Sequence, residues 1–315
     1  MRVRAASQAA PGRAENEDIA FHQSGLVGVL DGVSAPEGFT TGCRHTPGWY
    51  VRRLAARLAE GADDSSSALS DVLAAAITTV RSDHGGDCDL GNPASPAATV
   101  CLARATEDSL EYLVLSDATL VVQQDGGVHT VTDARFATVI GALNASFPPA
   151  PATRDDEFVR WRHAYFTRKY QLTNQPGGYW VASTVSDAGH QAVTGSFPLH
   201  GPGGVRHAAL LTDGTSCAVD LFGLMDWPEL LDVLRLKGPD ELIRRVAPPR
   251  TRTIAARAPV RAGRAGTTPR PSGAASRRSR DSQERSAGRV EPAHPSRALA
   301  GEAPLHWPIG GSWHG

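Results

Sequence analysis

The chain has 315 residues, 41% of them hydrophobic and 21% charged, which is enough for a sizeable buried core in one large domain or two ordinary ones. Its formal net charge of -1 at pH 7 favours neither nucleic acid nor a membrane as a partner of the whole chain. The N-terminal residues lack the apolar centre of a signal peptide, and no run approaches the roughly 18 apolar residues of a membrane span. We therefore expect a cytoplasmic protein.

The first elements along the chain are a hairpin and two helices. Apolar runs at 19–23 and 26–31 flank Ser24-Gly25, a two-residue hairpin signal. A helix is predicted over 47–60, where Thr46 can cap the N-terminus and a proline fills the first helical position. Apolar residues at helical spacing predict a second helix within 67–83.

Short β-rich runs and further helices follow. The strand-like runs are 97–105, 110–124, 128–132 and 205–213. Helices are predicted over 155–170, 227–236 and 239–246, and Asp226 with Glu229 has the spacing of a capping box before the second of them. Strands clustered between pairs of helices indicate an α+β sandwich more than a regular βαβ fold.

The composition changes near Val246. Residues 247–315 are dense in Arg, Pro, Ala, Gly and Ser, with too few large apolar side chains to offset the entropy of ordering, so we predict a domain at 1–246 and a disordered basic tail at 247–315. The chain has only two lysines, Lys169 and Lys237. In the tail, Arg takes the place of Lys throughout. GC-rich codons spell such a composition in almost any frame, so a translated out-of-frame 3′ end and a genuine basic tail both stand as explanations.

Carboxylates surround the predicted hairpin. Glu15, Glu17 and Asp18 precede its first strand, and Asp31 ends its second. If the strands pair, Glu17 and Asp18 lie beside Asp31 and Gly32 at one edge of the sheet. Such a group of like charges is unfavourable unless a cation neutralises it. Oxygen ligands favour Mg²⁺ or Mn²⁺, and a glycine at position 32 would let its backbone carbonyl approach the ion.

Three Asp-Gly pairs differ in their surroundings. Asp125 lies between two alternating runs and is typical of a hairpin turn. Asp31 and Asp213 instead end unbroken apolar runs, so each could be delivered to a sheet end by a buried strand. Taken alone, either Asp31-Gly32 or Asp213-Gly214 could be an ordinary turn. The nearby acids at 17–18 favour a metal site over a turn.

The cysteines and histidines show no metal-ligand spacing in the sequence. There is no CxxC pair and no neighbouring His at zinc spacing, so we expect free thiols in a reducing compartment. The cysteines are Cys43, Cys88, Cys101 and Cys217.

Five segments in this order, "RAENED", "VGVLDGVS", "PAATV", "LVLSDAT" and "ALLTDG", resemble the successive motifs of bacterial type 2C (PPM-type) metal-dependent protein serine/threonine phosphatases. The resemblance covers residues 1–246 and implies a four-layer α-β-β-α sandwich with two antiparallel sheets flanked by helices. It also implies hydrolysis of phosphoserine and phosphothreonine through two Mn²⁺ or Mg²⁺ ions and a bridging water, without a covalent enzyme intermediate.

Metal ligands carry over from this resemblance motif by motif. Asp31 is similar to the Asp that bridges both ions, and Glu17 to a ligand of one of them. Asp213 would hold the other ion, and Gly32 would offer its carbonyl. Asp117 occupies the position that helps many bacterial members to bind a third, weaker ion.

Two catalytic roles are implied as well. Arg13 matches the Arg that grips the substrate phosphate, for which a guanidinium fork is suited, and Asp18 resembles the acid that orients metal-bound water. The implied partners are proteins phosphorylated on Ser or Thr, such as substrates of a bacterial Ser/Thr kinase. We expect a monomer that binds neither membrane nor nucleic acid.

Two departures from the family pattern leave the activity open. Some members have a His after the bridging Asp-Gly, where this chain has Val33. The family also ends on a strand opened by an Asp-Asp or Asp-Asn pair whose first Asp completes the metal site, and none follows Val246. We therefore expect one ion to bind weakly and activity to be low or absent. The alternative function is a catalytically inactive relative that binds phosphorylated partners.

Overall fold

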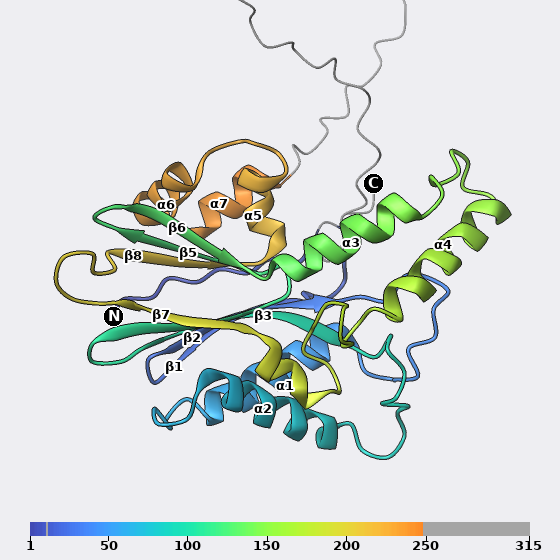
Figure 1. Ribbon diagram of the computed structural model, residues 1–315, viewed down its shortest axis with the longest axis horizontal. Helices are drawn as coiled ribbons and strands as arrows, with labels where there is room; N and C mark the ends of the chain where they lie inside the picture. Colours follow the sequence, from blue (N-terminus) through green and yellow to red (C-terminus); the bar gives the residue numbers. More distant parts are fainter. Residues whose placement is uncertain (11, 248–315) are drawn as a thin grey trace, which may run out of the picture. The chain divides into compact units, whose positions relative to one another are not determined.

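The computed structural model describes residues 1–10 and 12–247, so the predictions for the tail and for the final acidic motif lie outside the described residues. The described strands form two antiparallel sheets (Figure 1). The first has the order β1 (Asp18–Gln23), β2 (Leu26–Val33), β3 (Ala97–Ala105), β4 (Ser109–Leu115) and β7 (Val193–Pro198). The second has the order β6 (Gly127–Thr132), β5 (Thr119–Gln124) and β8 (His207–Leu211).

Helices cover the outer faces of the two sheets (Figure 1). α1 (Pro47–Glu60) and α2 (Leu69–Asp83) share a core with the first sheet, and α5 (Asp213–Asp220), α6 (Trp227–Leu236) and α7 (Pro239–Val246) share one with the second. The remaining helical elements are α3 (Ala134–Ser146), α4 (Asp156–Tyr170) and the 3-10 helix η1 (Ser186–Gln191). The predicted four-layer α-β-β-α sandwich is confirmed.

Side-chain alternation along the strands builds these layers. In β3, Leu102 packs toward α1 and α2, whereas its neighbour Cys101 joins the cluster between the sheets. In β5, Leu120 belongs to that inner cluster and Val121 to the one under α5–α7. Because successive side chains of a strand point to opposite faces, each central strand supplies two hydrophobic layers.

Local signals explain where several elements begin. Ser24 and Gly25 have φ of 47° and 86°, the left-handed pair that a tight hairpin requires, so β1 and β2 are joined as predicted. The Thr46 side chain accepts from the Trp49 N–H at the start of α1, and Asp226 forms the predicted capping box with Glu229. These caps fix the helix starts that the sequence predicts.

Four elements were not predicted, α3, α5, β7 and η1, and one predicted run is divided. α3 buries only Ile140 and Leu143, so its apolar periodicity is weak. α5 opens on the Asp-Gly that ends the preceding run, and β7 contains Gly and Pro near the edge of its sheet. The run 110–124 breaks at Ser116, whose φ is 67°, where the chain passes from the first sheet to the second. No described helix combines the length and apolar character needed to cross a membrane.

Candidate active site

The β1–β2 hairpin places acidic residues at one end of the first sheet. Asp18 is directly opposite Asp31 in the antiparallel register, and the Gly32 N–H donates to the Glu17 carbonyl at 2.9 Å. A Cβ on Gly32 would lie 2.8 Å from that carbonyl oxygen, so the close approach of the two segments requires glycine. Glu17 and Asp18 therefore flank the end of β2, as the sequence predicts.

Two more carboxylates join this pair from other elements. Asp117 lies in the turn where the chain leaves β4 for β5, and Asp213 is the first residue of α5, two residues after β8 ends. Both interact electrostatically with the Asp31 carboxylate. The structure thus brings together an acidic centre, by which we mean Asp18, Asp31, Asp117 and Asp213 with the adjacent Glu17.

Burial and mutual repulsion raise the pKa values in the acidic centre. Asp31 is only 2% exposed, and burial followed by the charges of Asp18 and Asp213 holds its pKa well above the ordinary value. Burial and the Asp117 charge raise the pKa of Asp213 to about 8. Burial also raises the pKa of Asp117 to about 6, against the opposing charge of Lys169. Without a cation, the folded protein resists full ionisation of this group.

Two buried oxygens in the acidic centre lack donors. Asp31 Oδ1 and Asp213 Oδ1 have no hydrogen-bond partner among the described residues. A buried acceptor without a donor is unfavourable, and a divalent cation would satisfy both oxygens and neutralise the repulsion. An all-oxygen donor set suits Mg²⁺ or Mn²⁺. The residues present therefore fit the ions that the sequence predicts.

Glu17 and Glu15 face different surroundings despite their closeness in sequence. The Ser34 hydroxyl donates to Glu17 Oε2 at 2.7 Å, which fixes this carboxylate beside the end of β2. Glu15 instead accepts from Thr46 Oγ1 at 2.9 Å and from Arg52 at 2.5 Å. Glu15 therefore belongs to the start of α1, and Glu17 to the acidic centre.

Arg13 is exposed in the segment before β1. Its guanidinium makes no hydrogen bond or ion pair with any other residue that the structure describes. A free fork-shaped cation on the segment leading into the acidic centre is available to an anionic ligand. The structure thus leaves Arg13 uncommitted, and its role as a phosphate ligand stays a prediction.

Lys169 is a charged residue of the site that the motif comparison missed. Its side chain, on α4, is 6% exposed, and burial lowers its pKa to about 8 while the charges of Asp117 and Asp213 oppose that shift. A small cavity is lined by both Asp117 and Lys169. The signal available in the sequence was rarity, because Lys169 is one of only two lysines.

Residues 16–161 match the family model described as protein phosphatase 2C. Over these residues the chain is similar to protein phosphatase 2C. The matched region contains Glu17, Asp18, Asp31 and Asp117, whereas Asp213 lies beyond it and joins the acidic centre through the fold. No curated protein sequence is significantly similar to this chain.

Solved phosphatase structures give weaker matches. The Mycobacterium tuberculosis serine/threonine phosphatase PstP/Ppp is 16% identical, with 76% of this chain and 88% of that chain covered and a TM-score of 0.45. Staphylococcus aureus Stp1 is 14% identical, with 76% and 86% covered and a TM-score of 0.46. Mycobacterium smegmatis MsPP, solved with cacodylate, is 18% identical, with 76% and 88% covered and a TM-score of 0.42. The likeness to protein phosphatase 2C rests on the sequence match over residues 16–161.

Proposed function

We propose that this type 2C phosphatase domain hydrolyses phosphoserine and phosphothreonine in proteins with Mn²⁺ or Mg²⁺ as cofactor. The observation that carries the proposal is the acidic centre, in which Asp31 Oδ1 and Asp213 Oδ1 are buried without donors among the described residues. Carboxylates from separate strands and turns are held together there against their own repulsion. That arrangement is costly for a structural cluster and suited to holding cations.

Each residue of the acidic centre has a proposed role. Asp31, the most buried, would contribute to both ions, with Glu17 and the Gly32 carbonyl on one side and Asp213 on the other. Divalent ions held there would supply an activated water and neutralise charge on the phosphoryl oxygens. Ser34 orients Glu17 through its 2.7 Å hydrogen bond, as outer residues orient metal ligands elsewhere. Asp117 would serve a third, weaker ion.

Positive charge for the substrate comes from two other elements. Arg13, exposed and without a protein partner among the described residues, would bind the phosphate through its guanidinium fork. Lys169 lies near Asp117 and Asp213 and would add a second positive charge at the cavity that it lines. Positioning and charge stabilisation of this kind dominate phosphoryl transfer. The proposed partners are phosphorylated Ser/Thr proteins, chosen by surface shape around the site.

The proposal is tested by phosphothreonine-peptide hydrolysis with the full chain, with and without Mn²⁺. We expect a slow, Mn²⁺-dependent turnover that Asp31→Ala lowers by about 10³-fold or more, since a ligand shared by both ions would be lost. The matched control is Asp125→Asn, because Asp125 also precedes Gly but its exposed carboxylate pairs with Arg206 at 2.9 Å. Turnover that survives Asp31→Ala, or that needs no divalent ion, would refute the proposal.

The absence of an Asp-Asp or Asp-Asn pair after Val246 favours a second candidate, a catalytically inactive domain that binds phosphorylated proteins. The same experiment separates the two functions. An inactive binder would show no Mn²⁺-dependent turnover above the Asp31→Ala background, yet would retain a phosphothreonine peptide in an Arg13-dependent manner. Binding measured by fluorescence anisotropy with the unphosphorylated peptide as control gives that second readout.

A further inference from the structure

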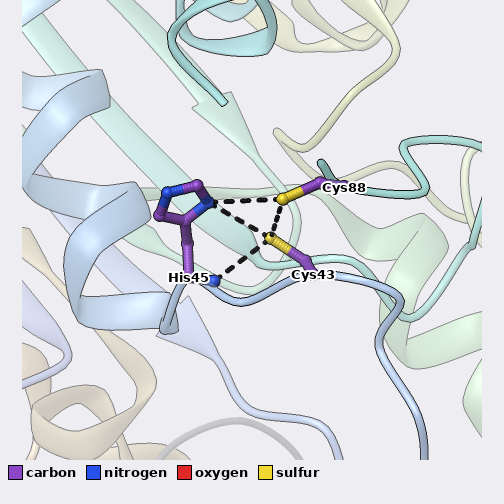
Figure 2. A group of neighbouring side chains, drawn as sticks. All are labelled: Cys43, His45 and Cys88. Atoms are coloured by element: carbon purple, nitrogen blue, oxygen red, sulfur yellow. Dashed lines mark hydrogen bonds between the residues drawn. The ribbon is translucent and has the colours of Figure 1, made fainter. Parts of the chain in front are cut away.

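A second group of metal-ligand side chains lies on two loops away from the strand ends that form the acidic centre. Cys43 and His45 belong to the loop before α1, and Cys88 to the loop between α2 and β3. Figure 2 shows both sulfurs and one ring nitrogen of His45 pointing toward one another. We call these three residues the thiol–imidazole cluster, and their ligand atoms all lie within 4.8 Å of one another.

The separations in the cluster are close to those of ligands around one tetrahedral ion, with the two sulfurs slightly nearer to each other. Zn–S bonds of about 2.3 Å and Zn–N bonds of about 2.0–2.1 Å place tetrahedral ligands roughly 3.5–3.8 Å apart. Here Cys43 Sγ is 3.5 Å from His45 Nδ1, Cys88 Sγ is 3.6 Å from the same nitrogen, and the two sulfurs are 3.4 Å apart. The sulfurs are much farther apart than the roughly 2.05 Å of a disulfide.

The surrounding loops hold this geometry. The Asp89 N–H donates to the Gly42 carbonyl at 2.7 Å, and Asn92 Nδ2 donates to the Thr40 carbonyl at 3.0 Å. These bonds join the loop carrying Cys43 and His45 to the loop carrying Cys88. The two segments are therefore held side by side before any ion binds, which lowers the ordering cost of ligation.

Aromatic neighbours hold the imidazole in place. The His45 ring stacks on Trp49 with centroids 3.9 Å apart, and His84 approaches it edge-on at 5.1 Å. Burial and the neighbouring positive groups lower the pKa of His45, which favours the neutral form that ligates metals. His84 Nδ1 lies 2.8 Å from the Val80 carbonyl, and its buried Nε2 has no partner among the described residues. The His84 Nε2 atom, near the cluster, is thus left without a hydrogen-bond partner among the described residues.

We propose that Cys43, His45 and Cys88 bind one Zn²⁺ ion that fastens the loop before α1 to the loop before β3. Two thiolates and an imidazole are soft and borderline ligands that select zinc over Mg²⁺ or Mn²⁺. The fourth position is available to water. The same two loops supply Ser34, Ala94 and Ser95 to the cavity that Asp117 and Lys169 line, so the ion would stabilise one wall beside the acidic centre.

Sequence spacing did not reveal this cluster, which the structure brings together in space. Only one residue separates Cys43 from His45, whereas Cys88 lies 43 residues beyond His45. The third ligand therefore became a neighbour only through the packing of the two loops. Without an ion, burial raises the pKa of Cys43 to about 11, so binding must release thiol protons and should strengthen as the pH rises.

The site is tested with Co²⁺, which reports thiolate ligands by charge-transfer absorption in the near ultraviolet. The full chain is reduced, stripped with a chelator and titrated with Co²⁺, then with Zn²⁺. We expect a thiolate-to-cobalt band that saturates at one equivalent and is removed by one equivalent of Zn²⁺. Carboxylate-bound Co²⁺ gives no such band, so the readout is blind to the acidic centre and independent of phosphatase activity.

Variants assign the ligands. Cys43→Ser and Cys88→Ser should each weaken Zn²⁺ binding on the order of 100-fold and remove most of the charge-transfer band. Cys217→Ser, a partly buried thiol outside the cluster, is the matched control and should keep the full band. Far-ultraviolet circular dichroism shows whether each variant folds, and the wild-type titration stands if one does not.

Two outcomes would overturn the proposal. One is the absence of a thiolate-to-cobalt band in the reduced wild-type chain. This outcome includes a chain whose Cys43 and Cys88 formed a disulfide before it was reduced. The other is a band that remains unchanged in folded Cys43→Ser or Cys88→Ser.

Discussion

The acidic centre and the thiol–imidazole cluster would hold an ion in opposite ways. The acidic centre takes carboxylates from the ends of β2 and β8 and from the turn after β4, where buried charges repel. The thiol–imidazole cluster lies on loops, and burial favours the neutral forms of Cys43 and His45 by raising the pKa of the thiol and lowering that of the imidazole. An empty acidic centre therefore destabilises the fold, whereas an empty thiol–imidazole cluster only leaves two loops less firmly joined.

The largest expected effect separates the two sites by metal. After both ions are removed with a chelator, Mn²⁺ should raise phosphopeptide turnover by about 10³-fold or more, because only hard ions suit the all-oxygen ligands. One equivalent of Zn²⁺ should raise the melting temperature without restoring turnover, since it occupies the thiol–imidazole cluster first.

Cys43→Ser tests whether the responses to Mn²⁺ and to Zn²⁺ are independent. It should keep its response to Mn²⁺ within a few-fold of wild type and lose the stabilisation by Zn²⁺. Equal loss of both responses would show that the two sites act as one unit.

The fold could be predicted from the sequence wherever local signals and burial agree. The Ser24-Gly25 turn, the Thr46 cap and the Asp226 capping box each fix one element, and all three are present in the structure. α3 could not be predicted because only Ile140 and Leu143 of its residues are buried. The break at Ser116 was hidden inside a continuous apolar pattern, since strands in two different sheets can follow one another without a polar gap.

The residues of the two sites also differ in whether the sequence could predict that they meet. Asp31 and Asp18 could be placed together because a two-residue turn dictates their register. Lys169 and the Cys88 ligand reach their sites only through packing of α4 and of the loop after α2, which no spacing rule encodes. Ligands supplied by neighbouring strands are thus readable from sequence, and ligands supplied by distant loops are not.

The stability of the metal-free protein should fall as the pH rises through the raised pKa values of the acidic centre. The pKa of Asp213 goes from its ordinary 3.8 to about 8, and that of Asp117 to about 6. The folded state therefore retains protons that the unfolded state has released, and their stabilising contribution is lost as the pH rises from about 4 to about 8, on the order of a few kcal/mol. Urea unfolding across this range measures the change.

Asp213→Asn is the control for this pH dependence, because asparagine does not titrate. Its metal-free stability should vary less with pH than that of the wild type. With saturating Mn²⁺ the wild-type slope should reverse, since the ion binds the deprotonated carboxylates. A metal-free stability that rises from about pH 5 to pH 8 by the same amount in both proteins would contradict the repulsion described for the acidic centre.

A smaller effect is expected at the proposed phosphate ligand. Arg13→Lys keeps the charge but loses the two-pronged geometry, so KM for the phosphopeptide should rise about 10-fold while the Mn²⁺ requirement is unchanged. Arg235→Lys, an exposed arginine paired with Asp232 on α6, is the matched control. A KM equal to that of the control would remove Arg13 from the site.

The smallest effect tests whether the two metal sites are coupled through the segment before β1. Glu15 lies two residues before Glu17 yet bonds to Thr46, the residue after His45, so it touches the helix start next to the thiol–imidazole cluster. Glu15→Gln should cost only about 0.5 kcal/mol of unfolding free energy, because its pairing with Arg52 is exposed and screened. Mn²⁺ activation and the cobalt band should each change less than about twofold. A shift of about tenfold in the affinity for either Mn²⁺ or Co²⁺ would mean that Glu15 transmits strain between the two sites. Glu17→Gln, by contrast, should weaken Mn²⁺ binding and leave the cobalt band unchanged.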